Sequence, residues 1–404
     1  MSKERFLLDD KDDPWESIDK RKISHALAIR DFMLGPGRFL PDPNETLQKL
    51  SEKIVNADVP LDRCVTIVGL LNAEGLASMR VWNKDQGAEA HILPHSPESD
   101  RGYRRSPAAL AHEHKQWVFF NPQLTEEAAF GIVKELQGDG FTGYICAPNF
   151  MANGMHSIFS FATKAKDGFS QEDIAFFKAV FPAIAACQEI LMVHRLLKEV
   201  TRTYIGEEPH RRVLSGDVRR GEVSRISSAI LFADMRDFTQ LTSTMTAEET
   251  TSLLNTYFDC IVPAIEQNDG EVLKFMGDGI LAIFRDVESD VVASNNALKA
   301  ALLGLQAVED NNVNDVLKFE VGIALHFGEV AYGNVGSGQR LDYTVIGRDV
   351  NLTSRIAGLC GPKGQKLLLS ESLKERVESG ELLDVGEQAL KGIDEKQRVF
   401  AYSF

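Results

Sequence analysis

Two aspartates have the residue type and surroundings that most directly suggest chemistry. Asp234 follows an apolar stretch at residues 228–232, and Asp278 lies between glycines that separate apolar stretches at 271–276 and 280–284. If these stretches are strands of one sheet, with the first and third as neighbours, the two carboxylates meet at its edge. Such a pair can hold two divalent cations for in-line attack at phosphorus. Each aspartate also has a simpler explanation, because Asp278 suits a hairpin turn and Asp234 can cap the turn after its strand.

The elements around these aspartates predict a ferredoxin-like βαββαβ sandwich of the α+β class. A helix is expected to begin at Thr246, which has the capping-box spacing to Glu249, and to end near Gln267. The hairpin that carries Asp278 follows this helix. A second helix at 289–310 and a strand at 318–326 complete the unit.

Three ordered blocks make this pattern specific. The segments FADMRDFT (232–239), KFMGDG (274–279) and DYTVIGRDVNLTSR (342–355) resemble the successive signature blocks of class III adenylyl and guanylyl cyclases, in particular the bacterial adenylyl cyclase type. The resemblance covers the expected catalytic domain, residues 227–404, including its closing ALKGI and VFAY segments. It implies conversion of ATP to 3′,5′-cyclic AMP and pyrophosphate.

The resemblance also implies which residues carry out the reaction. Asp234 and Asp278 would hold two Mg²⁺ or Mn²⁺ ions per active site, one activating the ribose 3′-hydroxyl and one neutralising the triphosphate. Asn351 and Arg355 are four residues apart on a predicted helix and therefore share one face. Asn351 would orient the ribose, and Arg355 would stabilise the charge that builds on the α-phosphate.

Substrate-binding residues follow from the same resemblance. Lys274 and Thr344 occupy the base-reading positions and imply adenine, because a guanylyl cyclase is expected to carry glutamate and a cysteine-like residue there. Lys391 matches the lysine that binds the terminal phosphates. Phe238 and Thr239 lie in the turn that would surround the triphosphate.

Asp237 departs from the family pattern, which often has glycine at this position of the turn. Its carboxylate can repel the triphosphate, which lowers the expected rate but does not change the expected reaction.

The chain is expected to form a homodimer. In the family fold, the metal-binding aspartates of one active site come from one subunit, and the residues that read the base and the transition state come from the other. This chain holds both sets. Upstream, residues 170–205 contain apolar residues at alternating steps of three and four, as in a coiled-coil stalk. These are Phe176, Ala179, Ala183, Ala186, Ile190, Val193, Leu197, Val200 and Tyr204. A helix that packs against its own domain is the alternative, and residues 206–226 are expected to be a connector.

The N-terminal half predicts a second α+β domain. Residues 47–169 alternate helical stretches with short strands and resemble a GAF-like sensory module, preceded by an N-terminal extension at 1–46. An unknown small-molecule or protein signal would act there.

The composition of the chain limits its expected binding partners and its expected location in the cell. The net charge of −15 argues against binding to nucleic acid. We expect no membrane span, because no apolar run approaches about 20 residues, and a cytoplasmic location, because the N-terminus does not resemble a signal peptide.

Alternative functions are a guanylyl cyclase, a diguanylate cyclase and a catalytically silent, nucleotide-binding dimeric regulator. Lys274 and Thr344 argue against the first, and the absence of a Gly-Gly-Asp/Glu-Glu-Phe signature argues against the second. The presence of every expected catalytic residue argues against the third.

Overall fold

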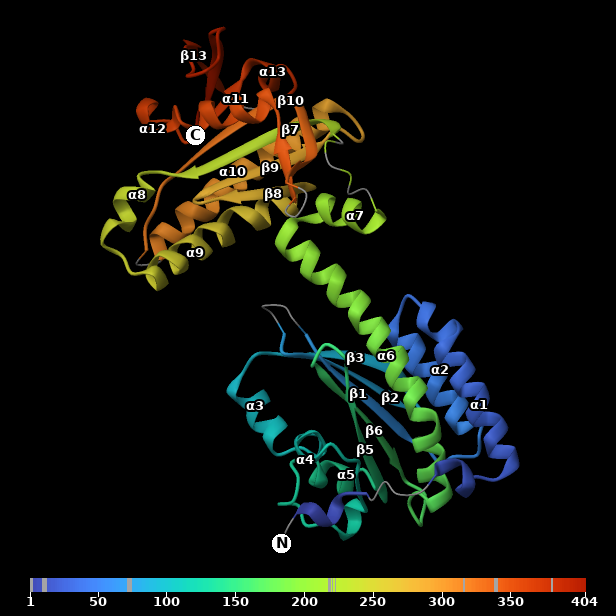
Figure 1. Cartoon of the computed structure of the whole chain (residues 1–404). Coiled ribbons are helices and arrows are strands. Elements are labelled where there is room, and N and C mark those ends of the chain that lie inside the picture. The colour runs from blue at the N-terminus through green and yellow to red at the C-terminus, as the bar shows by residue number, and fades with distance from the viewer. Residues whose placement is uncertain are drawn as a thin grey trace. The chain divides into compact units, whose positions relative to one another are not determined.

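The computed structural model contains two compact units, Met1–Val200 and Thr201–Phe404 (Figure 1). It describes residues 3–8, 13–70, 75–216, 219, 221, 223–314, 317–337, 341–378 and 381–404. Each unit has its own sheet and its own hydrophobic core.

The first unit is built on a six-stranded antiparallel sheet with the order β3-β2-β1-β6-β5-β4. The strands are β1 (Arg63–Gly69), β2 (Ala77–Asn83), β3 (Gly87–Leu93), β4 (Val118–Phe120), β5 (Gly143–Phe150) and β6 (His156–Thr163). The helices are α1 (Lys20–Leu34), α2 (Pro43–Val55), α3 (Pro97–Arg104), α4 (Pro107–His114), α5 (Val133–Gly138) and α6 (Gln171–Ile205). The mixed α+β architecture expected for this half is present.

Helices cover both faces of this sheet, because successive side chains of a strand point to opposite sides. Ile145 of β5 belongs to a core with α1, α2 and the first part of α6, whereas the next residue, Cys146, belongs to a core with α4 and α5. Figure 1 shows these two groups of helices on opposite sides of the strands.

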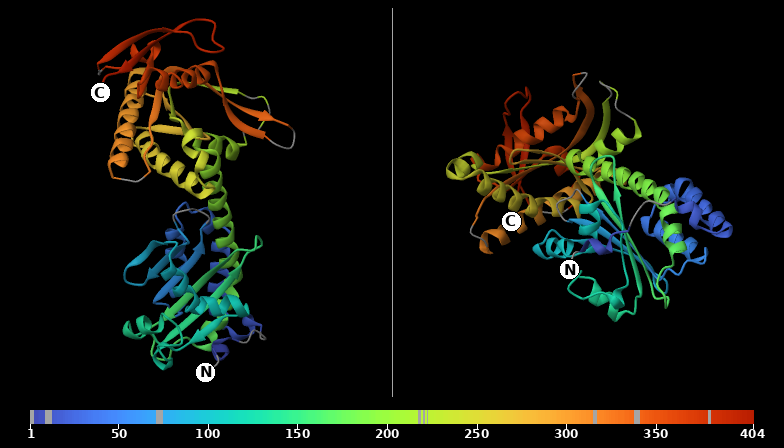
Figure 2. Two further views of the ribbon diagram at one scale, coloured as in Figure 1. Left: turned by 90° about the vertical axis from the view of Figure 1, so that its left-hand side faces the viewer. Right: turned by 60° about the horizontal axis from the view of Figure 1, so that its bottom comes forward.

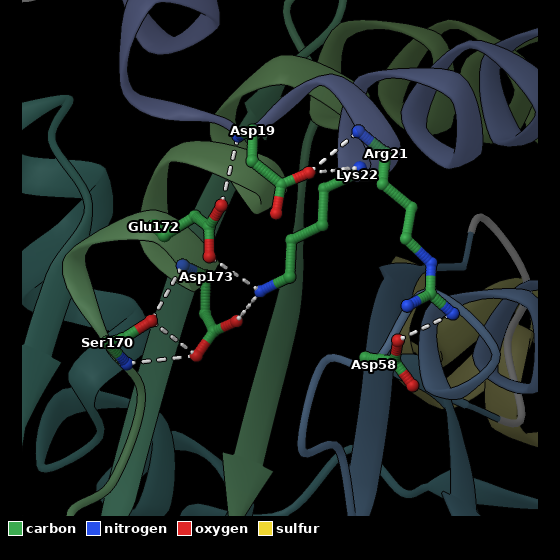
Figure 3. Close-up of polar contacts among 7 residues, drawn as sticks. All are labelled: Asp19, Arg21, Lys22, Asp58, Ser170, Glu172 and Asp173. Carbon is green, nitrogen blue, oxygen red and sulfur yellow. Dashed lines mark hydrogen bonds and ion pairs between the residues drawn. The ribbon is translucent and has the colours of Figure 1, made fainter.

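The segment expected as an N-terminal extension is part of the first unit. Lys22 of α1 lies 2.8 Å from Asp173 Oδ1 and 3.1 Å from Glu172 Oε2, at the start of α6. The backbone N–H of Asp19 donates to Glu172, so the beginnings of the two helices are tied together (Figure 3). The structure therefore differs from the expected domain boundary at residue 47. Further along α1, three residues at helical spacing are buried in the core: Ala26, Ile29 and Met33.

The expected stalk, α6, has two parts. Phe176 and Ala183 are buried in the core of the first unit, as in the alternative of a domain-packing helix. Val193, Leu197 and Tyr204 are 43%, 48% and 80% exposed. The second part therefore leaves apolar side chains on its surface, while the stalk itself stays a prediction.

By length and composition, α6 could cross a membrane, which differs from the expectation that the chain has no such stretch. However, 56% of its apolar window is buried inside the structure, as is usual for a core helix.

The second unit is built on an eight-stranded sheet. Its strand order is β13-β14-β12-β10-β7-β9-β8, and β11 pairs with β10. The strands are β7 (Val223–Met235), β8 (Gly270–Met276), β9 (Gly279–Arg285), β10 (Val321–Gly336), β11 (Leu341–Ile346), β12 (Leu367–Ser370), β13 (Leu382–Gln388) and β14 (Gln397–Tyr402). The helices are α7 (Glu207–Ser215), α8 (Phe238–Leu241), α9 (Ala247–Glu266), α10 (Asp290–Asn314), α11 (Arg348–Ala357), α12 (Cys360–Lys363) and α13 (Glu371–Lys374).

The expected βαββαβ arrangement is present as β7, α9, β8, β9, α10 and β10. The capping box of Thr246 and Glu249 begins α9 as predicted. The expected connector at 206–226 contains α7 and the start of β7, and its residues 217, 218, 220 and 222 lie outside the described part of the chain. The hairpin of β10 and β11 extends away from the body of this unit (orange, Figure 2).

The two faces of this sheet carry different helices. Leu231 of β7 belongs to the core that contains residues of α9 and α10, whereas Phe232 belongs to the core that contains residues of α11. This alternation fixes the face of the sheet to which each side chain of β7 points, including the side chains just after its buried part.

Candidate active site

The register of the second sheet brings Asp234 and Asp278 together. β7 and β9 are antiparallel neighbours, with Ala233 opposite Ile280. Asp234 follows Ala233, and Asp278 lies in the turn just before β9. Gly277 in this turn has a φ of 68°, a conformation that glycine adopts without strain. The two strand ends therefore converge as predicted.

The two carboxyl groups lie close enough for the charge of Asp278 to act on Asp234. Partial burial, together with this charge, raises the pKa of Asp234 to about 7. Two carboxylates so close repel each other unless a proton or a cation lies between them. Their oxygen ligands suit a hard divalent cation such as Mg²⁺ or Mn²⁺.

Within the described part of the chain, this pair has no third metal-binding side chain. Within the described ranges, no group of three or more His, Cys, Asp or Glu residues could hold a metal ion. Two carboxylates leave most coordination positions of Mg²⁺ to water and to substrate phosphates. The pair therefore fits a cation that arrives with a phosphorylated substrate better than a permanently bound structural metal.

Tyr257 of α9 lies near this pair and was not among the residues expected at the site. Its side chain is fully buried, and its hydroxyl group has no hydrogen-bond partner among the residues that the structure describes. Burial raises the pKa of Tyr257, and the charges of Asp234 and Asp278 add to this effect. In the sequence, its position four residues after Leu253 marks only a core residue of an amphipathic helix.

The turn after β7 contains the residues expected around the triphosphate. Arg236 anchors it, because its guanidinium lies 2.8 Å from Glu320 Oε2 and its backbone N–H donates to the Glu320 carbonyl. Phe238 packs against the core, whereas Thr239 is exposed. The Phe238 side chain therefore supports the turn, and the Thr239 hydroxyl is available to a ligand.

Asp237 occupies a strained position in this turn. Its φ of 53° is left-handed, which costs about 1 kcal/mol or more for a residue with a side chain. Its side chain is exposed and makes no capping hydrogen bond to α8. The backbone here is thus one that favours glycine.

Asn351 and Arg355 lie one helical turn apart on α11. Both are exposed, whereas Leu352 and Ile356 on the same helix are buried in the core. In the part of the chain that is described, neither exposed side chain forms a hydrogen bond or an ion pair, so both are available to a ligand.

The start of α11 is held in place by Asp349. This carboxylate accepts a hydrogen bond from the Glu329 N–H at 2.7 Å, and its Oδ1 lies 3.7 Å from His326 Nε2. The His326 imidazole lowers the pKa of Asp349, and the Glu329 hydrogen bond acts in the same direction. A charged Asp349 therefore fixes the helix that carries Asn351 and Arg355.

The remaining predicted residues lie elsewhere in the second unit. Lys274 is exposed on β8, and Lys391 is exposed after β13. Thr344 of β11 pairs with Gly333 of β10, but its side chain lies outside the described part of the structure. The structure thus brings the two aspartates together, and Asn351 and Arg355 are exposed on α11.

The family model that matches this chain covers the second unit. Residues 223–404 match the model of the adenylate and guanylate cyclase catalytic domain. An adenylate cyclase of Anabaena cylindrica is 36% identical over 165 residues, which are 39% of this chain and 32% of that protein. The chain thus spans about a third of the length of this relative.

Two solved structures are also similar. The adenylyl cyclase CyaB from P. aeruginosa is 25% identical with a TM-score of 0.40, and the match covers 45% of this chain and 96% of that chain. The guanylyl cyclase Cya2 is 28% identical with a TM-score of 0.39, and the match covers 46% and 94%. On the family model and the sequence relative, the second unit carries an adenylate and guanylate cyclase catalytic domain. These findings do not identify the first unit, whose GAF-like nature stays a prediction.

Proposed function

We propose that this catalytic domain is an adenylyl cyclase, which converts ATP to 3′,5′-cyclic AMP and pyrophosphate. The ribose 3′-oxygen bonds to the α-phosphorus, the bond from that phosphorus to the leaving pyrophosphate breaks, and the 3′-hydroxyl proton passes to solvent. The observation that supports this proposal most directly is the pair of Asp234, at the end of β7, and Asp278, in the turn before the neighbouring strand β9, whose charges act on each other.

Asp234 and Asp278 would bind two Mg²⁺ or Mn²⁺ ions. When bound, these ions supply activation of the 3′-hydroxyl and neutralisation of the triphosphate. Burial and the charge of Asp278 raise the pKa of Asp234, and a bound cation would favour its ionised form because a nearby positive charge stabilises a carboxylate.

Residues of α11 and the surrounding loops would act on the nucleotide. Arg355 stabilises the charge that builds on the α-phosphate as pyrophosphate leaves, and Asn351 orients the ribose. Lys391 and Thr239 bind the other phosphates. The exposure of these four side chains supports these roles.

We expect Asp237→Gly to raise kcat/KM for ATP by about twofold to tenfold, because it removes a carboxylate beside the triphosphate. The free energy of unfolding should change little, because the variant relieves the strain of the left-handed backbone but gains freedom in the unfolded state. Initial rates and thermal melting measure the two effects. Asp286→Asn, another exposed aspartate of the same unit, is the control. A lower rate in Asp237→Gly would show that its carboxylate assists the reaction.

Adenine would be selected by Lys274 and Thr344. We expect Lys274→Glu to lower kcat/KM for ATP at least about tenfold and to raise it for GTP, because glutamate accepts hydrogen bonds from the guanine N–H groups. Lys299→Glu, an exposed lysine on α10, is the control. An unchanged ratio of ATP to GTP turnover would argue against base reading by Lys274.

The proposed enzyme is a cytoplasmic homodimer with composite active sites, regulated by its GAF-like first unit. The exposed apolar side chains in the second part of α6 support a coiled-coil contact between two copies.

Product formation from ATP or GTP by the purified chain with Mn²⁺ tests the proposed function. Cyclic AMP from ATP is the expected result, whereas cyclic GMP from GTP would establish the alternative of a guanylyl cyclase. Nucleotide binding by calorimetry without any product would establish a silent regulator.

A further inference from the structure

A cavity of about 540 Å³ lies in the first unit, between its sheet, the segment 38–50 and the second part of α6. This volume is in the range of sites that bind small organic molecules. Most of its wall is apolar and comes from several elements, including Met33 of α1, Leu47 of α2, Phe159 of β6 and Leu191 of α6. The apolar wall suits a ligand with a hydrocarbon or aromatic body.

Arg80 is a buried cation on the wall of this cavity. It lies in the middle of β2, opposite Thr66 of β1, and Thr66, Ser78 and Arg80 all line the cavity. Only 9% of Arg80 is exposed. Its side chain makes no hydrogen bond and no ion pair among the residues that the structure describes.

Thr66, the polar neighbour of Arg80 on β1, is hydrogen-bonded to another residue. Thr66 Oγ1 accepts a hydrogen bond from Gln188, whose Oε1 in turn accepts from Ser157 at 2.7 Å. This network satisfies its own members but does not include Arg80. A buried guanidinium without an anion is costly, and among the described residues no group supplies that anion.

The charges around the cavity also favour an anion. Four lysine or arginine side chains and one carboxylate, that of Glu199, line it, although the whole chain has a net charge of −15. Glu199 is paired with Arg195 at 2.5 Å. Burial lowers the pKa of Arg80, and the charge of Arg195 adds to this, while Asp42 and Glu199 oppose it from beyond hydrogen-bond distance.

We propose that this cavity binds a small organic anion, a carboxylate or a phosphate ester with an apolar body, and that Arg80 is its anchoring residue. The guanidinium offers two parallel donors to either headgroup, and the apolar wall encloses the rest of the ligand. Cys187–Glu199 of α6 contribute to the wall, and the same helix continues to Ile205. An occupant would therefore contact the helix that leads to the catalytic unit. Binding itself does not depend on the proposed cyclase activity.

Three probes with one apolar body test the proposal by titration calorimetry with the full chain. They are 4-phenylbutyrate, 4-phenylbutyl phosphate and the neutral 4-phenylbutanol. We expect at least one anion to bind about tenfold more tightly than the alcohol. A hydrogen bond between charged groups contributes a binding free energy that corresponds to about this ratio of affinities. The tighter of the two anions identifies the headgroup class. No preference for either anion over the alcohol would overturn the proposal without the need for any variant.

Variants of Arg80 distinguish a role in anchoring the anion from a purely structural role. Arg80→Met should weaken anion binding about tenfold or more, leave alcohol binding unchanged, and raise the melting temperature of the ligand-free protein, because it removes an unpaired buried charge. Arg80→Lys keeps the charge and should retain part of the preference for the anion. Arg104→Met, at an exposed arginine of α3 outside the cavity, is the matched control. A folded Arg80→Met protein that binds the anion as tightly as the unmodified chain would overturn the proposal.

Discussion

Asp278→Asn is expected to lower kcat for cyclic AMP formation about a thousandfold and, at the same time, to stabilise the catalytic unit. Activity falls because one of the two carboxylates for the cations is lost. Stability rises because Asp278 opposes ionisation of Asp234 in the folded protein. A gain of about 1 kcal/mol corresponds to a melting temperature about 2–4 °C higher for a domain of this size.

The pH dependence of this stabilisation provides a second measurement. The ordinary pKa of Asp234 is 3.8, and in the folded protein it is about 7. An acid with a raised pKa destabilises the fold increasingly as the pH rises between these two values. The difference in melting temperature between the variant and the unmodified chain, measured in a metal chelator, should therefore be near zero at pH 4 and complete at pH 8.

Asp286→Asn is the matched control, because this aspartate is exposed just after β9. It should change neither activity nor the pH dependence. If Asp278→Asn instead lowered both the activity and the melting temperature, Asp278 would act in folding. Full activity in the variant would refute the proposed metal pair.

The sequence predicted the aspartate pair because the determinants are local. The capping box at Thr246 and the glycines around Asp278 each fix one connection, and the order of the elements then makes β7 and β9 neighbours. Once the two strands are paired, Asp234 and Asp278 have little freedom to lie apart.

The boundary of the first unit was not predicted, although a signal was present. Ala26, Ile29 and Met33 are three and four residues apart, which is typical of a helix that packs against a core. The short apolar side chains and the many charges of α1 obscure this pattern.

Arg80 could not have been assigned from the sequence. A single arginine in an apolar strand can end in solvent, in an ion pair or in a cavity, and only the packing of α6 and the segment 38–50 against the sheet distinguishes these outcomes. The absence of a partner depends on every neighbouring side chain in three dimensions.

A mixture of two inactive variants is expected to regain activity if the active sites are composite. Asp278→Asn lacks a metal carboxylate, and Arg355→Ala lacks the cation that stabilises the α-phosphate, so each alone should be inactive. In a heterodimer, one site combines the intact Asp278 of one copy with the intact Arg355 of the other, while the second site has neither. When the two chains are co-expressed in equal amounts, about half of the dimers are heterodimers, and about a quarter of the original activity returns.

The control for this experiment is a mixture of Asp278→Asn with Asp234→Asn. Both changes affect the same group of residues, so no heterodimer contains an intact site and no activity should return. The difference between the two mixtures rests on the proposed composite site, in which the carboxylates at the end of β7 and in the β8–β9 turn come from one copy and Arg355 of α11 comes from the other. If the Asp278→Asn and Arg355→Ala mixture stays inactive while sequential purification on two different affinity tags recovers heterodimers, each site is built from a single chain and the composite arrangement is wrong.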